Sequence, residues 1–204
     1  MSAAAALRAR RAHGPHGADN RRIGALFAVG AALFAVAAVP GASSLSREGD
    51  AVTFFLGSIF FTAAAFEQLR LSAPEPAERW SSAIQLAGTV FFNVSTFTAI
   101  LDHLPGGEQD LVIWSPDAFG SVCFLVSSAI AFWTVRGDRD VARREAALNL
   151  LGSILFGASA VGAYVIPDTG EFWDATLNRM ATLWGALCFL VAAIDLARGR
   201  PTLP

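Results

Sequence analysis

The sequence predicts an all-α protein that crosses a membrane six times. Of its 204 residues, 54% are hydrophobic and 16% are charged, whereas about 25% are charged in a typical soluble protein. The apolar residues are gathered into six runs, and the mean hydropathy of the chain is +0.49. Each run comes close to the roughly 20 residues that a helix needs to cross a hydrocarbon core about 30 Å thick. This composition excludes an ordinary soluble enzyme, a nucleic-acid-binding protein and a secreted disulfide scaffold.

The runs are predicted to be helices because their apolar residues do not alternate and because Ala, Leu and Phe predominate over β-branched residues. Pro40-Gly41 closes the first run and Pro167 closes the fifth, since proline ends helices. The arginine-rich residues 1–22 are predicted to form a disordered tail, and residues 198–204 a short second tail. The predicted transmembrane domain, residues 23–197, has helices at 23–40, 51–69, 81–101, 117–136, 147–166 and 177–197.

The arginines predict the orientation of the chain in the membrane. All fifteen basic residues are arginine, and thirteen lie toward one side of the predicted bundle: before the first helix, near the junction of helices two and three or of helices four and five, or after helix six. Only Arg47 and Arg179 lie toward the opposite side. The positive-inside rule therefore predicts that both termini are cytoplasmic. Because high Ala and Arg without Lys is typical of a GC-rich genome, we expect a bacterial cytoplasmic membrane protein that has the lipid bilayer as its partner.

An alternative for the first run is a cleaved signal peptide, since arginines precede it and small residues follow it. Its apolar stretch of roughly 17 residues is longer than the 7–15 residues of a signal-peptide core. It also carries a motif that the other five runs share, which favours a transmembrane helix.

The shared motif is a glycine, a small residue, two apolar residues and a phenylalanine, followed by more small residues. Its six glycines are Gly30, Gly57, Gly88, Gly120, Gly152 and Gly185. The third and fifth copies are 64 residues apart and the fourth and sixth are 65 apart, so the third and fourth helices look like a copy of the fifth and sixth. This spacing predicts internal duplication of a helical hairpin, with the first two helices as a diverged copy.

The motif predicts how the helices pack. Residues four, seven and eight positions after a glycine lie on the same helix face as that glycine. Because lipid provides little hydrophobic drive between helices, association depends on close backbone approach at small residues, with phenylalanine filling the adjoining space. The stripes are expected to join the three hairpins into one bundle, or to join copies of the chain into a homo-oligomer.

Three segments of the chain are similar to a known family: QLAGTVFFNVST, WSPDAFGSVCFLVSS and LNLLGSILFGASA. They resemble the YrhK-like family of small bacterial membrane proteins, and the resemblance extends over roughly residues 50–195. Members of that family are often a single hairpin, whereas this chain has three. The resemblance implies an integral membrane protein of uncharacterised function, and it implies no catalytic residues.

Four polar residues form one stripe along the third predicted helix, at Gln85, Thr89, Asn93 and Thr96. Their spacing places them on one helix face. Such a stripe either lines a hydrated path or binds a polar substrate, or it joins helices through hydrogen bonds worth about 0.6 kcal/mol each. We favour packing, and Asn93 has the most hydrogen-bonding groups to satisfy.

Two acid–arginine pairs lie at the predicted cytoplasmic ends of the second and sixth helices. Glu67 and Arg70 are three residues apart, as are Asp195 and Arg198, and both pairs lie equally far after their motif glycines. Residues with this spacing meet on a helix surface, so ion pairs at the membrane interface are predicted. A proton-transfer role for Glu67 is the alternative.

Few residues are candidates for chemistry. Cys123 and Cys188 occupy the same motif position and are expected to be small buried thiols, with redox activity as the alternative. Asp102 and His103 match no metal-ligand pattern, so neither a metal nor a cofactor is predicted. No Ser-His-Asp, HExxH or GxSxG arrangement is present for catalysis.

We therefore expect a non-enzymatic membrane protein, either a small transporter or channel or a structural component of the membrane. The alternative is a redox or quinone- or lipid-binding accessory protein, which the abundant phenylalanine and the two thiols favour. No nucleic-acid partner is expected, and the sequence does not specify a substrate.

Overall fold

The computed structural model confirms the all-α fold. It describes residues 16–39, 47–72, 74–101, 110–137, 141–166 and 168–198. All six expected helices are present, and each is long and apolar enough to cross a membrane. They are α2 (His16–Ala38), α3 (Arg47–Leu71), α4 (Pro76–Ile100), α6 (Ser115–Val135), α7 (Val141–Gly162) and α8 (Ala175–Arg198). A five-residue π-helix, η1 (Asp110–Trp114), directly precedes α6.

Several helices begin earlier than the apolar runs. α2 begins at His16, so residues 16–22 are helical rather than part of a disordered tail. Its first turn carries an aspartate, whose negative charge stabilises a helix N-terminus. α4 begins at Pro76, because proline suits the first helical position, where no backbone N–H is needed. Residues 1–15 and 199–204 lie outside the described residues, as do three expected helix breakers, Pro40, Gly41 and Pro167.

The fifth expected helix ends earlier than the sequence predicts. α7 stops at Gly162 rather than at Ile166, because the chain then turns into a short hairpin, described over residues 163–166 and 168–174. In this loop hairpin the N–H of Ile166 donates to the carbonyl of Glu171 at 2.8 Å, and the N–H of Trp173 donates to the carbonyl of Tyr164 at 2.7 Å. These bonds satisfy backbone groups that another turn of helix would otherwise have used.

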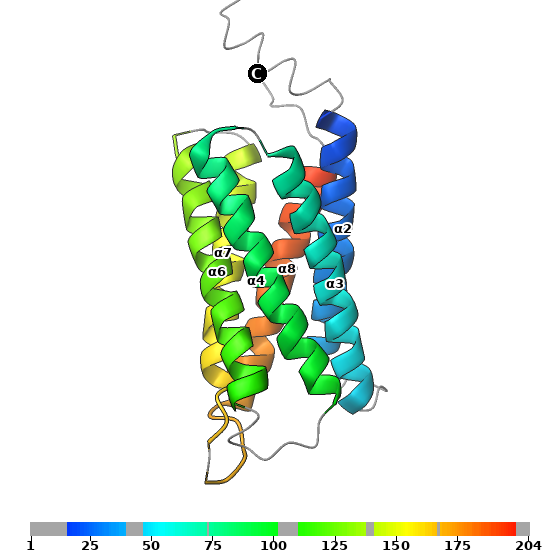
Figure 1. Cartoon of the computed structure of the whole chain (residues 1–204), viewed down its shortest axis with the longest axis vertical. Helices are drawn as coiled ribbons and strands as arrows, with labels where there is room; N and C mark the ends of the chain where they lie inside the picture. Colours follow the sequence, from blue (N-terminus) through cyan, green and yellow to red (C-terminus); the bar gives the residue numbers. More distant parts are fainter. Residues whose placement is uncertain are drawn as a thin grey trace, which may run out of the picture.

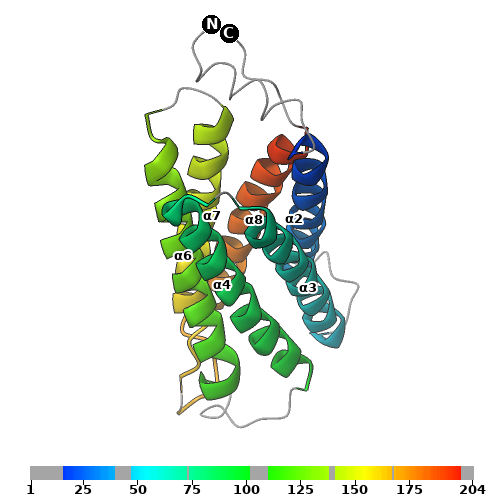
Figure 2. The same ribbon diagram turned by 45° about the horizontal axis from the view of Figure 1, so that its top comes forward.

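The six helices form a closed ring in which each packs against two neighbours. The order around the ring is α2, α3, α4, α6, α7 and α8, and α8 packs against α2. Neighbouring helices run in opposite directions (Figure 1). α2 begins and α8 ends at one end of the bundle, which we call the terminal end, and the opposite end carries the loop hairpin and is called the loop end (Figures 1 and 2). Three helical hairpins, α2–α3, α4–α6 and α7–α8, therefore surround a common axis.

Each helical hairpin is closed by its two motif glycines. In α4–α6, a Cβ added to Gly88 would lie 3.1 Å from the carbonyl oxygen of Gly120, and the reverse distance is also 3.1 Å. Phe124, four residues after Gly120, covers Gly88. Phe92 covers Gly120 in the same way. Glycine is required at both positions because the two backbones are in contact. Equivalent contacts join Gly30 with Gly57 and Gly152 with Gly185.

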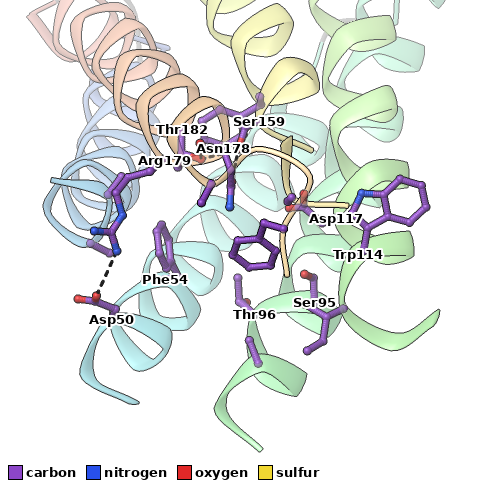
Figure 3. Close-up of a pocket in the computed structure, with 18 of the residues that line it drawn as sticks. Asp50, Phe54, Ser95, Thr96, Trp114, Asp117, Ser159, Asn178, Arg179 and Thr182 are labelled. Carbon is purple, nitrogen blue, oxygen red and sulfur yellow. Dashed lines mark hydrogen bonds and ion pairs between the residues drawn. The ribbon is translucent and has the colours of Figure 1, made fainter. Parts of the chain in front are cut away.

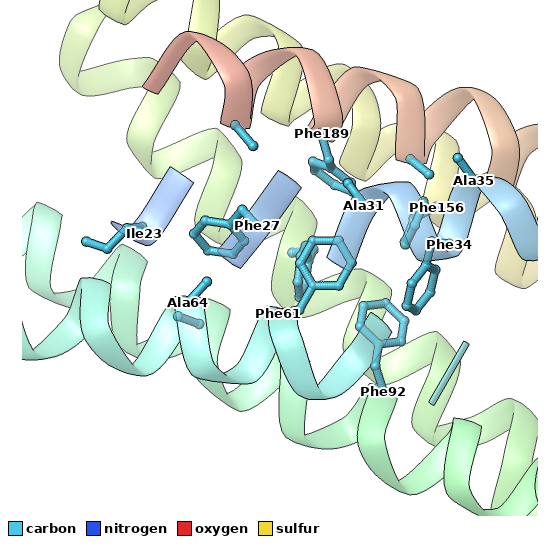
Figure 4. Close-up of a cluster of buried hydrophobic side chains, with 14 residues drawn as sticks. Ile23, Phe27, Ala31, Phe34, Ala35, Phe61, Ala64, Phe92, Phe156 and Phe189 are labelled. Atoms are coloured by element: carbon cyan, nitrogen blue, oxygen red, sulfur yellow. The ribbon is translucent and has the colours of Figure 1, made fainter. Parts of the chain in front are cut away.

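The six motif phenylalanines meet on the axis of the bundle, and we call them the phenylalanine layer. None is more than 5% exposed, and they are Phe34, Phe61, Phe92, Phe124, Phe156 and Phe189. Contacting rings lie 5.1–6.3 Å apart between centroids, mostly edge to face. Figure 4 shows five of these side chains converging from different helices. The centre of the ring is therefore filled at this level.

The seams between the helical hairpins differ. Between α3 and α4 the hydroxyls of Ser58 and Thr96 are 3.1 Å apart, and between α6 and α7 those of Ser128 and Ser153 are 2.8 Å apart. These residues stand one and eight positions after their motif glycines, where α8 and α2 have alanines. The α8–α2 seam is closed instead at Gly24, where a Cβ would lie 2.7 Å from a backbone carbonyl of α8. Hydroxyl pairs thus join two seams, and close backbone contact joins the third.

Candidate binding cavity

The polar stripe of the third expected helix joins α4 to its two neighbours. Asn93 donates from Nδ2 to a threonine hydroxyl of α3 at 2.9 Å, and Thr96 meets a serine hydroxyl of α3 at 3.1 Å. Gln85 lies toward the other neighbour, since its Oε1 accepts from a serine of α6 at 3.5 Å. Thr89 is fully buried and donates to a backbone carbonyl of its own helix at 2.7 Å. The stripe is divided between two interfaces, which favours packing over a continuous hydrated path.

A cavity of about 770 Å³ lies inside the ring toward the loop end. All six helices and the loop hairpin contribute to its wall (Figure 3). Its polar lining includes Asp50, Ser95, Asp117, Ser159, Asn178 and Arg179. A volume between about 300 and 1,000 Å³ is typical of sites for small organic ligands.

The phenylalanine layer forms the floor of this cavity. Phe34 and Phe156 belong to the layer and also line the cavity, with their ring centroids 5.8 Å apart. The exposed lining residues Phe172, Ala175 and Thr176 belong to the loop hairpin and the first turn of α8. The cavity is therefore closed toward the middle of the bundle and open at the loop end.

Three charged side chains line the cavity at two separate places. Asp50 of α3 and Arg179 of α8 form an ion pair, with Asp50 Oδ2 4.0 Å from Arg179 Nη2. The other carboxylate oxygen, Asp50 Oδ1, is buried and accepts no hydrogen bond within the described part of the chain. Asp117 of α6 lies on the far side of the cavity from this pair (Figure 3). Among the described residues, Asp117 has neither a hydrogen bond nor an ion pair.

A hydrogen-bond network fixes the wall that α7 and α8 provide. Ser159 Oγ donates to Asn178 Oδ1 at 2.8 Å and lies 2.6 Å from Thr182 Oγ1. Thr182 in turn donates to the backbone carbonyl of Asn178 at 2.8 Å. The two hydroxyls and the amide oxygen therefore satisfy one another, so this wall is ordered without a ligand.

Trp114 fixes the wall beside Asp117. Its indole N–H donates to the carbonyl of Ala160 in α7 at 2.7 Å, and its ring meets Tyr164 edge to face, with centroids 5.1 Å apart. Trp114 and Asp117 are three residues apart across the junction of η1 and α6, and both line the cavity. A π-helical turn is often found at a functional site, and here it ends at the tryptophan that borders the cavity.

The sequence pattern does not single out the charged lining residues, because they lie outside the shared motif. Counted from the motif glycines, Asp117 and Thr182 stand at the same position, three residues before the glycine, where α3 has Phe54. Asp50 and Asn178 also share a position, seven residues before theirs. The cavity wall thus consists of equivalent positions that differ between the helical hairpins. The sequence signal for this cavity is therefore the set of equivalent positions at which the three hairpin copies differ, rather than those that they share.

Ion pairs gather at the terminal end. Glu67 pairs with Arg70 as the sequence predicts, at 2.6 Å, and also with an arginine of α2 at 3.2 Å. The second expected pair is different, because Asp195 contacts Arg144 of α7 at 3.4 Å instead of Arg198. The reason is burial: the Asp195 side chain is only 5% exposed and points toward α7, whereas Arg198 is exposed.

The thiols and the acidic loops provide no second site in the described part of the chain. Cys123 and Cys188 are free and half-buried, in α6 and α8. Among the described residues, no three His, Cys, Asp or Glu side chains are placed to hold a metal ion. Asp102 and His103 lie outside the described residues.

No protein-family model matches the chain, and no curated protein or solved structure shows significant similarity to it. The resemblance to the YrhK-like family therefore rests on the three segments that carry it. Any functional conclusion has to come from the cavity and from the membrane-spanning architecture.

Proposed function

We propose that this chain is a non-enzymatic, multi-pass protein of the bacterial cytoplasmic membrane that binds a small molecule in its cavity and acts as a small transporter. The observation that carries the proposal is a cavity lined by all six helices, with charged residues on membrane-spanning segments. Charged groups at such positions are costly and are associated with ligand and ion pathways. Many transporters also place their substrate site between structural repeats.

Access from one side favours a transporter over a channel. The cavity is open at the loop end, and the phenylalanine layer closes it toward the terminal end. A channel needs a continuous path, whereas a transporter exposes its site to one side at a time. A purely structural bundle is less favoured, because carboxyl groups around a cavity stabilise a membrane bundle less than packed apolar side chains do.

The orientation and the repeat belong to the same proposal. With both termini in the cytoplasm, the loop end faces outward and the cavity receives its ligand from outside. We propose that the three helical hairpins are copies of one unit, which the three matching glycine pairs support. A homo-oligomer and the surrounding lipid remain the proposed partners.

Native mass spectrometry of the full chain in mild detergent tests the proposed binding. Ala99 lines the cavity, so Ala99→Trp is designed to fill it. Val94 of the same helix is 47% exposed, and Val94→Trp is a matched control. We expect the wild type and Val94→Trp to retain a non-protein mass that Ala99→Trp lacks. A mass that Ala99→Trp also retains, or no retained mass in any of the three, would contradict the proposal.

A quinone- or lipid-binding accessory protein is the second candidate. The observation that favours it is the aromatic part of the cavity lining, which consists of Phe34, Phe54, Trp114, Phe156 and Phe172. Such a wall suits a flat apolar ring. The same mass spectra separate the candidates, because a retained quinone or lipid has a characteristic mass that a polar or charged solute does not share.

A further inference from the structure

We infer that the cavity binds an organic cation, a protonated or quaternary centre carried on an apolar body, with Asp117 as its counter-ion. This inference deepens the proposed function and rests on it. Three features of the cavity carry it: its balance of charge, the type of hydrogen-bonding group left unused, and its aromatic wall.

The balance of charge in the cavity is negative when its carboxyl groups are ionised. Arg179 is the cationic lining residue, and it already faces Asp50 at 4.0 Å. Asp117 stands on the far side of the cavity, and the described residues supply no cation to it. A carboxylate on a membrane-spanning helix is stabilised by an opposite charge nearby. A cationic ligand next to Asp117 would supply that charge.

Both carboxyl groups of the cavity have acceptor oxygens that no donor in the described chain satisfies. Asp50 Oδ1 is buried without a hydrogen bond within the described chain, and the Asp117 carboxyl group has no donor there either. The hydroxyl protons of Ser159 and Thr182, by contrast, have acceptors within their own wall, in Asn178 or in each other. An anionic ligand that met Arg179 would still share the cavity with two carboxyl groups, one of them without an ion pair. A cation next to Asp117 does not meet that obstacle.

The aromatic wall suits a cation with an apolar body. Trp114 lies three residues before Asp117, lines the cavity and is held in place by its bond to Ala160. Phe54 in α3 and Asp117 in α6 stand at the same position, three residues before their motif glycines. A cation within about 6 Å of an aromatic face is attracted by the negative charge of that face. Tryptophan and a neighbouring carboxyl group together therefore recognise both the charge and the apolar surface of such a ligand.

Two probes of the same shape and opposite charge test the inference. Tetraphenylphosphonium and tetraphenylborate are each titrated against the purified full chain in detergent by equilibrium dialysis. We expect saturable binding of tetraphenylphosphonium that Asp117→Asn weakens by at least about tenfold, which corresponds to about 1.4 kcal/mol. Asp168→Asn, an exposed acid at the same end of the bundle, is the matched control and should leave binding unchanged.

The outcomes separate the inference from the proposed function. Binding of tetraphenylborate as tightly as tetraphenylphosphonium, lost in Ala99→Trp, would overturn the cationic ligand and leave the cavity as a binding site. Binding that Ala99→Trp does not change would count against the cavity itself, and the inference would fall with it. Asp117→Glu keeps the charge and should restore binding, which distinguishes loss of the counter-ion from misfolding. Failure of this rescue in a folded variant would overturn the role of Asp117.

Discussion

The middle of the bundle and its loop end use equivalent positions of the same three helical hairpins in different ways. In the middle, every helix places a glycine and a phenylalanine at the same positions, and the result is a filled layer. At the loop end, equivalent positions hold Phe54, Asp117 and Thr182, and the result is a cavity. Close contact between backbones permits few residue types at a position, whereas a wall that borders a cavity permits many. Repetition therefore marks packing in this molecule, and departure from repetition marks the candidate site.

The largest effect is expected from a side chain added to the middle. In Gly152→Leu the new Cβ alone would lie 3.0 Å from the carbonyl oxygen of Gly185 and 2.9 Å from the Phe189 ring. Since a backbone atom cannot move aside, we expect the free energy of unfolding to fall by well over the value of about 1–3 kcal/mol that ordinary overpacking costs. Size-exclusion chromatography should then show no folded bundle. Gly157→Leu, in the same helix with open space around its Cβ position, should fold. Equal yields of the two variants would refute the contact.

Removal of a ring from the phenylalanine layer should have the next largest effect. Phe61 is 2% exposed and meets four other phenylalanines. Phe61→Ala should lower the melting temperature in detergent. The loss of unfolding free energy should be smaller than the value of about 3–5 kcal/mol seen in soluble cores, because lipid is as apolar as the protein interior. Phe66→Ala on the same helix, 56% exposed, should change it little. Similar losses in both would show that the layer does not hold the bundle together.

The hydroxyl pairs of the seams should contribute less. Ser128 and Ser153 share a hydrogen bond at 2.8 Å, and such interhelical bonds are worth about 0.6 kcal/mol in membranes. A double-mutant cycle with Ser128→Ala and Ser153→Ala measures this coupling from unfolding in denaturing detergent. Thr134→Ala, whose hydroxyl bonds to its own helix, serves as the reference for loss of an intrahelical bond. A coupling of zero would show that the hydroxyl pair does not stabilise the α6–α7 seam.

The smallest effect on stability is expected at the cavity, where the difference is instead one of access. In a Cys123→Ser, Cys188→Ser background, Ser95→Cys lies in the cavity wall and should react with a water-soluble maleimide. Ser127→Cys lies outside the cavity, so it should react far more slowly. The two serines are similarly buried, at 5% and 2% exposed, so the cavity is what distinguishes them. Equal reaction rates would contradict a hydrated cavity bounded by the phenylalanine layer.

The number of helices and their packing code follow from local features. Six apolar runs of membrane-spanning length predict six helices, and glycine with phenylalanine four residues later predicts where they touch. The ends of the helices are harder to predict. α2 and α4 begin among polar residues that precede their apolar runs, and α7 stops where the following residues form the loop hairpin. Helix boundaries of this kind depend on backbone hydrogen bonds that hydropathy does not report.

Partners across the bundle were less predictable. The spacing of Asp195 and Arg198 allows an ion pair, but the fold turns Asp195 inward to Arg144. The polar stripe of α4 looks like one surface along a single helix, yet its residues serve two interfaces. In both cases the helix face is known from spacing, whereas the residue that it meets depends on which neighbour lies there.

Composition and spacing along the chain thus determine that this protein is an all-α membrane bundle whose glycines lie at its contacts, because both properties depend on segments of about twenty residues or fewer. The position of the cavity is decided only when the ring closes. Asp50, Asp117 and Arg179 are each more than sixty positions from the next in the sequence, and they border one space because α3, α6 and α8 all begin at the same end of the ring. Closure of six helices is a property of the whole chain, and no single segment contains it.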